Sequence, residues 1–271
     1  MKEQVLSSPF VTKSFLKLAY DLDAYGQEIF KNHLIADNEI SNIGNRSFVD
    51  YRPTLVTSNK ELELRGVNKI KLNSLNYFQV GDVLNELESK QYFVTKSDIA
   101  VNLNLVSSYE QYLEFLPKKK RHELKRKKRN FEKEITDVQL LESSSDDLFE
   151  VFIQQHRDSL GIKGEFMTED FKSFFYELLN TDNWKIYYLN SENSILSTAF
   201  CYETDKGCYL YNSTRNNLFN DLNPGIILND LIIQKLINEK KKFFDFLKGT
   251  ERYKYDFGGI SVQLYDLKIN L

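Results

Sequence analysis

The stretch NPGIILNDLIIQKLINEKKKFFDFLKGTERYKYDFGG, residues 223–259, decides the fold of the C-terminal half of the chain. It opens close to Pro-Gly, and apolar residues then recur three and four positions apart before the short apolar run 243–247. Proline in a first turn and this spacing predict a core-facing helix, and the run after it predicts a buried strand. The residues predicted to face inward from the helix are Ile226, Leu228, Leu231, Ile232, Leu236 and Ile237.

The segments upstream of this helix predict the sheet to which the strand belongs. A cap at Thr168, with apolar residues at helical spacing after it, predicts a helix. Three antiparallel strands are predicted at 185–189, 195–202 and 208–213. The passage from 208 to 247 is then a strand–helix–strand unit, for which a right-handed parallel crossover is the rule. Its loop lies at a strand's carboxyl end beside a helix start, where open sheets bind ligands.

The helix start at Asn223-Pro224-Gly225 is a candidate phosphate site. Free backbone N–H groups at a helix N-terminus and the helix dipole attract phosphate, and glycine lets the phosphate approach the backbone. Pro-Gly also begins many helices that bind nothing, so an ordinary helix start is the alternative interpretation.

The loop after the strand carries groups with chemistry. Asp245 interrupts the apolar strand, and its carboxylate needs a partner because an unpaired buried acid is costly. Gly249 permits a sharp turn, after which Lys254 could bind phosphate or stabilise an oxyanion. Tyr253 could give a proton to a leaving thiolate or hydroxyl. The alternative is a surface loop with packed aromatic side chains.

A strongly basic element stands out from an otherwise acidic chain. The 271 residues carry a net charge of −3, but residues 118–133 hold ten Lys or Arg against two Glu, a local charge of +8. Pro117 suits the first turn of a helix here, in which only Leu124 and Phe131 are apolar. A solvated helix that contacts an anionic ligand is the main interpretation. Dedicated nucleic-acid binding is the alternative, although the run lacks the interleaved aromatics of single-strand binders.

Composition favours a packed globular protein, with 41% hydrophobic and 14% aromatic residues. No apolar run approaches the roughly 18 to 20 residues of a membrane span, and a signal-peptide core is lacking, so a cytoplasmic protein is expected. Cys201 and Cys208 flank a predicted hairpin turn centred on residues 204 and 205, as a half-buried pair of thiols or, alternatively, a disulfide. His33, His122 and His156 form no catalytic pattern, and no zinc site is expected.

The N-terminal half has a weaker pattern. Helices are predicted at 12–20, at 80–90 and after a capping box of Ser108 with Gln111. Short strands are predicted near 54–56, 69–72 and 99–103. A regular pattern begins after 135–145. The predicted domains are therefore 1–136, which ends in the basic helix, and 137–271.

The stretch 223–259 resembles the closing segment of the CelD-like acetyltransferases, a family of the GNAT superfamily named for cellulose biosynthesis. That family follows a Pro-Gly helix start with a D-F-L-x-G-x-E-x-Y-K pattern, which is complete here at Asp245, Phe246, Leu247, Gly249, Glu251, Tyr253 and Lys254. The segments SSYEQYLEFLPKKKRHELKRKKRNFE and FIQQHRDSLGIKGEF are also similar to that family, so the likeness covers about residues 99–260. YKYDFGG is similar to the terminal F-K-x-x-F-G motif of the Fem-type peptidyltransferases.

The resemblance implies an α/β (α+β) fold of two GNAT-like units in tandem, with mixed central sheets flanked by helices and a degenerate first unit. It implies an N-acyltransferase in which an amine attacks an acyl-CoA directly, with acyl-CoA as co-substrate and no metal. One departure is that FNDLNPGI stands where ordinary GNAT enzymes bind the CoA pyrophosphate with a Q/R-x-x-G-x-G/A loop. Two alternatives therefore stay open: a Fem-type aminoacyl-tRNA-dependent peptidyltransferase, with tRNA on the basic helix 118–133, and a non-catalytic GNAT-like binding protein.

The resemblance also implies roles for particular residues. The donor is expected between splayed strands near Tyr211 and the helix at Gly225, with its carbonyl near N–H groups around Asn212 or near Lys254, which matches the Fem-type lysine. The residues predicted to bind the donor are Tyr211, Asn212, Asn223, Pro224, Gly225 and Ile226, with phosphate at the N–H groups of the last two. The residues predicted to be catalytic are Lys254, Tyr253, Glu251 and Asp245, the two acids as candidate bases and Tyr253 or Tyr211 as proton donor. The acceptor would be an amine of a small molecule or of a cell-envelope precursor.

Overall fold

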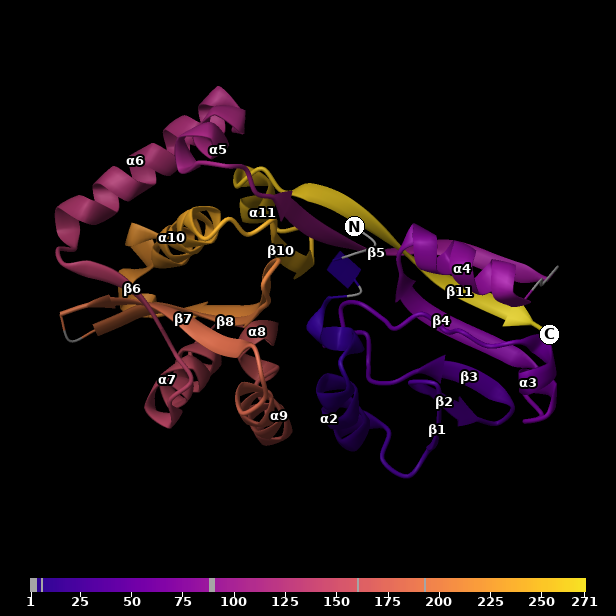
Figure 1. The fold of residues 1–271 in the computed structure, drawn as a ribbon. Coiled ribbons are helices and arrows are strands. Elements are labelled where there is room, and N and C mark those ends of the chain that lie inside the picture. The colour runs from indigo at the N-terminus through magenta and orange to yellow at the C-terminus, as the bar shows by residue number, and fades with distance from the viewer. Residues whose placement is uncertain (1–3, 6, 88–90, 160, 193) are drawn as a thin grey trace. The chain divides into compact units, whose positions relative to one another are not determined.

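A computed structural model describes residues 4–5, 7–87, 91–159, 161–192 and 194–271, and its contacts divide the chain into two compact units (Figure 1). Unit 1 comprises Met1–Ala100 and Ser261–Leu271, and unit 2 comprises Val101–Ile260. The chain therefore leaves unit 1, builds unit 2 and returns. By its contacts the basic helix falls in unit 2, and the sequence-based partition into 1–136 and 137–271 stays a prediction.

Unit 2 is built on a mixed sheet with helices on both faces, which confirms the predicted α/β class (Figure 1). Its strand order is β10-β9-β8-β7-β6, in which β6 to β9 are antiparallel neighbours and β9 runs parallel to β10. The bounds are Val138–Ser143 for β6, Trp184–Ser191 for β7, Ser194–Glu203 for β8, Gly207–Arg215 for β9 and Phe243–Lys248 for β10. The antiparallel strands and the parallel strand–helix–strand passage predicted from the sequence are therefore confirmed.

In unit 2, α7 and α9 cover one face of the sheet, and α10 covers the other with α5 and α6 beyond it (Figure 1). The bounds are Tyr109–Phe115 for α5, Lys118–Glu134 for α6, Asp146–Arg157 for α7, Ile162–Glu165 for α8, Glu169–Leu179 for α9, Asn217–Leu222 for η2, Pro224–Asn238 for α10 and Arg252–Asp256 for α11. Because α10 contacts both the sheet and the helices outside it, it is buried on more than one side. Ile227 and Ile233 are fully buried, whereas Ile226 and Leu231, which were predicted to face inward, are half-buried.

Side-chain caps fix where several of these helices begin. Ser108, Ser145 and Thr168 each accept a hydrogen bond from the backbone N–H three residues further on, as predicted for Ser108 and Thr168. In a capping box the side chain of Gln111 would accept a hydrogen bond from the backbone N–H of Ser108. Here Gln111 Oε1 accepts instead from the backbone N–H of Ser107, one residue earlier, at 3.3 Å. The buried residues of α6 are Leu124 and Phe131, one heptad apart. The basic helix therefore docks through a narrow stripe, as predicted.

Unit 1 has its own strands and its own core. Its strands are β1 (Glu28–Phe30), β2 (His33–Ala36), β3 (Glu39–Asn42), β4 (Lys69–Leu75) and most of β5 (Tyr92–Asn104) and β11 (Ile260–Asn270). Its helices are η1 (Pro9–Val11), α2 (Lys13–Asp23), α3 (Asn59–Glu63) and α4 (Tyr77–Leu87). Apolar residues of α4 pack on β3, β4 and β11 to form the core. The helix predicted at 12–20 and the strands predicted near 69–72 and 99–103 are confirmed, and residues 88–90 of the predicted second helix lie outside the described residues.

The strand predicted near 54–56 is wrong, because this segment has no regular secondary structure. The side chain of Gln79 in α4 contacts this loop. Its Nε2 donates to the carbonyl oxygen of Arg52 at 2.6 Å and to Thr54 Oγ1 at 3.1 Å. Val56 is 59% exposed, as expected of a partly solvated loop.

The two cysteines are buried free thiols. Glu203 lies opposite Cys208 and Cys201 lies opposite Leu210, so the hairpin turn is centred one position later than predicted and the two cysteines are not directly paired. Burial raises the pKa of the Cys208 thiol. In the described part of the chain, no helix has the length and apolar character that crossing a membrane requires.

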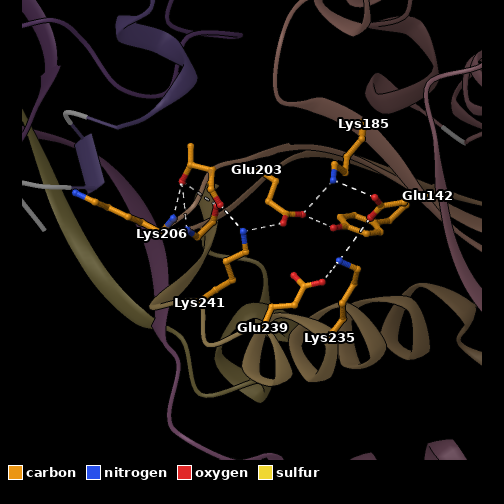
Figure 2. A network of polar contacts seen from close by, with 10 residues as sticks. Glu142, Lys185, Glu203, Lys206, Lys235, Glu239 and Lys241 are labelled. Carbon is orange, nitrogen blue, oxygen red and sulfur yellow. Dashed lines mark hydrogen bonds and ion pairs between the residues drawn. The ribbon is translucent and has the colours of Figure 1, made fainter.

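A charged network ties the strands of unit 2 to the C-terminal end of α10 (Figure 2). Glu203 is buried, accepts a hydrogen bond from the Tyr187 hydroxyl, and forms ion pairs with Lys241 at 3.1 Å and Lys185 at 3.6 Å. Lys235 of α10 extends the network to two further glutamates. Because each of these acids has a lysine partner, we interpret the network as structural.

A buried histidine gives unit 1 a pH-dependent stability. His33 is fully buried, and desolvation lowers its pKa from 6.5 to about 4. Between these two pKa values the unfolded chain binds a proton at His33 and the folded chain does not. The contribution of His33 to the free energy of unfolding is therefore fully present above pH 6.5 and is lost as the pH falls towards 4. Between pH 7 and 4.5 we expect this residue to remove about 2.5 kcal/mol of the free energy of unfolding.

Urea unfolding of the wild type and of His33→Asn at both pH values measures this effect. The variant is less stable throughout, but its loss of stability on acidification should be smaller by about 2.5 kcal/mol. An identical pH dependence in the two proteins would show that His33 is not the titrating group.

Candidate functional site

A pocket of about 300 Å³ lies where β9 ends and α10 begins, and we call it the α10 pocket. It lies entirely within unit 2. The residues that line it are Ser213 and Arg215 from β9, Asn220 from η2, Asn223 at the cap of α10, Gly225, Ile226 and Asn229 from α10, and Tyr253 from α11.

The pocket is next to the place where two strands diverge. The parallel pairing of β9 with β10 covers three residue pairs, and Tyr209 opposite Asp245 is the last. The register of β9 against β8 shifts between Leu210 and Asn212, so Tyr211 is an extra residue, as in a β-bulge. The structure thus has diverging strands at the position where the sequence predicted a splay.

The first turn of α10 presents a backbone N–H group at the pocket. Asn223 has left-handed dihedral angles, φ 56° and ψ 48°, and Pro224 follows at the first helical position. Of the two predicted phosphate donors, the N–H of Ile226 already donates to the carbonyl of Asn223 at 3.0 Å. No backbone carbonyl among the described residues accepts from the N–H of Gly225.

Gly225 also leaves open space beside the helix. A Cβ atom built at this position would have Ser197 Oγ as its nearest neighbour, at 3.8 Å. The packing of the chain therefore does not require glycine here. The absence of a side chain keeps room for a ligand at the first turn of the helix.

Asn229 is a buried polar residue of the pocket that the sequence prediction missed. It is 4% exposed and lies about one helical turn after Gly225. Its Oδ1 atom has no hydrogen-bond partner among the described residues. A buried acceptor without a donor costs about 1–3 kcal/mol, which a ligand N–H or O–H group would offset. The polar pair Asn229-Asp230 inside an apolar helical pattern was the available signal.

Tyr253 lies on α11, lines the α10 pocket, and packs edge-on against Phe246 with 6.0 Å between ring centroids. Burial, together with the charge of Glu251, raises the pKa of the Tyr253 hydroxyl above its ordinary value. The phenol is therefore protonated at neutral pH. Both its place and its protonation state suit the predicted proton donor.

Lys254 is buried, and its ammonium group is engaged by the chain itself. It is 2% exposed, and its Nζ atom lies 2.5 Å from the carbonyl oxygen of Lys248, 3.4 Å from that of Gly249 and 3.5 Å from that of Leu247. It also pairs with Glu251 at 3.0 Å. Lys254 does not line the α10 pocket. These contacts fix the turn between β10 and α11, and a direct role at the donor carbonyl stays a prediction.

Asp245 and Glu251 support the same turn. Asp245 is fully buried, and its Oδ1 accepts from the N–H of Leu247 at 2.8 Å, where the backbone is left-handed with φ 59°. Gly249 has φ 109°, a backbone conformation that side-chain-bearing residues rarely adopt, so the turn favours glycine. The Glu251 side chain is 57% exposed. Of the two predicted bases, Glu251 is therefore the one that solvent reaches.

The bulge places Tyr211 and Asn212 on one face of the sheet. Tyr211 stacks on Phe175 of α9 with 5.3 Å between centroids, and Asn212 is paired with Phe200, whose ring also contacts Phe175. Ser213 lines the α10 pocket, which neither Tyr211 nor Asn212 does. The side chains of Tyr211 and Asn212 therefore do not line the α10 pocket, and their predicted contacts with a donor stay a prediction.

A basic groove of about 1250 Å³ runs along α6. A small pocket beside it is lined by Lys120, Lys127 and Ile226, and Ile226 also lines the α10 pocket. The two sites are therefore neighbours in unit 2. The basic residues that line the groove are Lys118, Lys119, Lys120, Arg121, His122, Lys125, Arg126, Lys127, Arg129 and Arg252.

The sheet, the helix start beside diverging strands and the match to a family model together identify the protein as an acyltransferase of the GNAT fold. Residues 118–255, just over half of the chain, match the family model described as Acetyltransferase (GNAT) domain. The chain belongs to this family of GNAT acetyltransferase domains, which as a class bind acyl-CoA. The predicted GNAT membership is confirmed, and the narrower CelD-like assignment stays a prediction. Among the residues that the structure describes, no group of three or more His, Cys, Asp or Glu could hold a metal ion.

Solved structures of other proteins share the fold. A conserved protein of unknown function from Bacteroides thetaiotaomicron is 11% identical with a TM-score of 0.64, over 95% of this chain and 90% of that one. FemX is 10% identical with a TM-score of 0.64, over 99% and 94%. The C-terminal domain of a putative lysylphosphatidylglycerol synthetase from Agrobacterium fabrum is 12% identical with a TM-score of 0.57, over 94% and 91%. No curated protein sequence matches the chain.

Proposed function

We propose that the protein is an N-acyltransferase that moves an acyl group from acyl-CoA to a primary amine, and that the α10 pocket binds the donor. The observation that carries this proposal is the pocket itself. It combines an open N–H group at Gly225, a buried acceptor on Asn229 without a partner, and Tyr253. The pantetheine arm of CoA contains amide N–H groups, which can donate a hydrogen bond to the Asn229 oxygen. The phosphates of CoA can bind the free N–H group at the start of α10.

The chemistry is a direct displacement. The amine nitrogen attacks the thioester carbonyl, the new C–N bond forms, and the C–S bond breaks as the tetrahedral intermediate collapses. The hydroxyl of Tyr253 gives its proton to the leaving thiolate, and Glu251, which is exposed, takes the proton that the amine loses. Backbone N–H groups near Asn212 stabilise the oxyanion. Lys254 and Asp245 hold the turn that positions Tyr253.

The basic groove supports a second candidate, in which the acyl group arrives on a larger polyanion. Nine lysines and arginines line the basic groove, and the small pocket beside it shares Ile226 with the α10 pocket. Such a density of cations suits a chain of phosphates, as in an aminoacyl-tRNA. For a CoA donor, the same cations would instead contact the phosphates of the nucleotide. The amine acceptor would in both cases be a small molecule or a cell-envelope precursor.

Calorimetric titration with acetyl-CoA and with a longer acyl-CoA tests the donor. We expect micromolar binding by at least one of them. If neither binds, the acyl-CoA proposal fails, and titration with an aminoacyl-tRNA tests the second candidate. A chain that binds neither donor would be a non-catalytic protein on the same fold.

Replacing Tyr253 with phenylalanine separates binding from chemistry. Because the ring and its packing are kept, the Kd for acyl-CoA should stay within about twofold, while turnover should fall by about 100-fold. The release of CoA thiol in the presence of a panel of primary amines measures turnover. Tyr109→Phe in α5, outside the pocket, is a control for the loss of a partly buried hydroxyl. Unchanged turnover in Tyr253→Phe would remove this residue from the mechanism.

A further inference from the structure

A second pocket, of about 400 Å³, lies in unit 1 along helix α4. One side of it is formed by residues of α4 and its cap, at Asn76, Gln79, Asp82 and Glu86, whose spacing places them along one face of the helix. The loop with Thr54 and Val56 forms another wall. Nothing in the proposed acyl transfer uses these residues.

The inner end of this pocket offers a hydrogen-bond donor that the chain leaves without a partner. Asn76 caps α4, since its Oδ1 accepts from the N–H of Gln79 at 3.0 Å and Gln79 Oε1 accepts from the N–H of Asn76 at 3.0 Å. Asn76 is 2% exposed, and its Nδ2 atom has no hydrogen-bond partner among the described residues. The helix N-terminus adds partial positive charge at the same point. This end of the pocket therefore suits a carboxylate.

The outer end of the pocket is acidic. Asp82 and Glu86 follow Asn76 by six and ten positions along α4, which corresponds to about 9 and 15 Å at 1.5 Å per residue. Asp82 is half-buried and Glu86 is exposed. Carboxylates at this end suit an ammonium group. The opposed ends of the pocket thus match a molecule with a carboxylate and an amine roughly 9 to 15 Å apart.

We propose that this pocket binds a short zwitterionic peptide of about three residues, with its carboxylate at Asn76 and its amino group at the exposed carboxylate of Glu86. An extended chain spans about 3.3 to 3.6 Å per residue, so three residues match the distance from the helix start to the acids. As a binding site, this inference stands on the contacts of unit 1.

Trialanine is the probe, compared with its N-acetylated and its C-amidated forms. Calorimetry with the full chain and no acyl donor should give a submillimolar Kd for trialanine. Each capped form should bind at least tenfold more weakly, because each loses one of the two charges. Equal binding of all three forms, or no binding of trialanine, would overturn the proposal.

Variants locate the peptide. Asn76→Asp keeps the oxygen that caps α4 but replaces the donor with a negative charge, so trialanine affinity should fall at least tenfold in protein whose thermal unfolding shows that it is folded. Glu86→Gln should weaken trialanine by a similar factor and leave the affinity for the N-acetylated form unchanged. Glu63→Gln, an exposed acid of α3, is the matched control and should change neither. A peptide affinity that none of the pocket variants alters would place binding elsewhere.

The experiment also distinguishes this inference from the proposed function. Trialanine binding to Gly225→Val, whose donor pocket is filled, should equal that of the wild type. Binding of acyl-CoA without binding of trialanine would overturn the peptide site and leave the donor proposal standing. Binding of trialanine without binding of any acyl-CoA would do the reverse.

Discussion

Replacing Gly225 with valine is expected to weaken acyl-CoA binding by about 100-fold, which corresponds to about 2.7 kcal/mol. The reason is steric. The nearest atom to a Cβ at this position is Ser197 Oγ, 3.8 Å away, so the added methyl groups enter space that the proposal assigns to the donor. They also shield the N–H group at the helix start that would contact phosphate. Gly225→Ala should also weaken acyl-CoA binding, but by a smaller factor than Gly225→Val.

The stability of the chain should not fall in this variant. Gly225 has helical backbone dihedrals and no close neighbour, and both valine and alanine are better helix formers than glycine. The thermal midpoint of Gly225→Val should therefore stay within about 2 °C of the wild type or rise. Gly81→Val in α4 of unit 1, where nothing lies within 4 Å of the added Cβ, is the matched control. Wild-type affinity in Gly225→Val would exclude the α10 pocket as the donor site.

Much of the fold of unit 2 could be predicted from the sequence because its signals are local. The helix at 224 has a proline, an apolar spacing and a following apolar strand, and caps such as Thr168 mark other helix starts. The N-terminal half was harder to predict because its contacts are not local. The segment 54–56 was predicted as a strand, yet it has no regular secondary structure, and the Gln79 side chain of α4 binds the carbonyl of Arg52 and the hydroxyl of Thr54.

The candidate site could be predicted only in part, for a physical reason. Gly225 and Tyr253 belong to one continuous motif, so a pattern along the chain finds them. Ser213 and Asn229 enter the pocket through a β-bulge and a helical turn, which no short motif records. The same bulge places the side chains of Tyr211 and Asn212 on the face opposite the pocket, although the family resemblance implied that both residues bind the donor.

The contacts of Lys254 also explain why a motif can be specific without all of its residues being reactive. Asp245, Gly249, Glu251 and Lys254 each hold the turn between β10 and α11. Tyr253 is the residue of this motif that lines the α10 pocket. A turn with two left-handed residues and a buried ammonium group needs several particular side chains to form at all. The motif thus combines one candidate proton donor with the support that positions it.

Replacing Lys254 with alanine should therefore act first on stability. The change removes the ammonium donor from three backbone carbonyl oxygens at a buried turn, and leaving such acceptors unsatisfied costs about 1–3 kcal/mol each. For a chain of this size, the thermal midpoint should fall by about 10 °C. The Kd for acyl-CoA should rise as well, because Tyr253 is the next residue and loses its fixed position.

Glu251→Gln separates this positioning role from chemistry. Its side chain is 57% exposed, so loss of its ion pair should cost less than about 1 kcal/mol and leave the thermal midpoint nearly unchanged. If Glu251 takes the proton of the amine, turnover should nevertheless fall by about 100-fold with Kd retained. Thermal unfolding, titration and thiol release on both variants give the comparison. A Lys254→Ala protein with wild-type stability and donor affinity but little turnover would instead show that the ammonium group acts directly in the reaction, because only a group that contacts the transition state lowers turnover while leaving both unchanged.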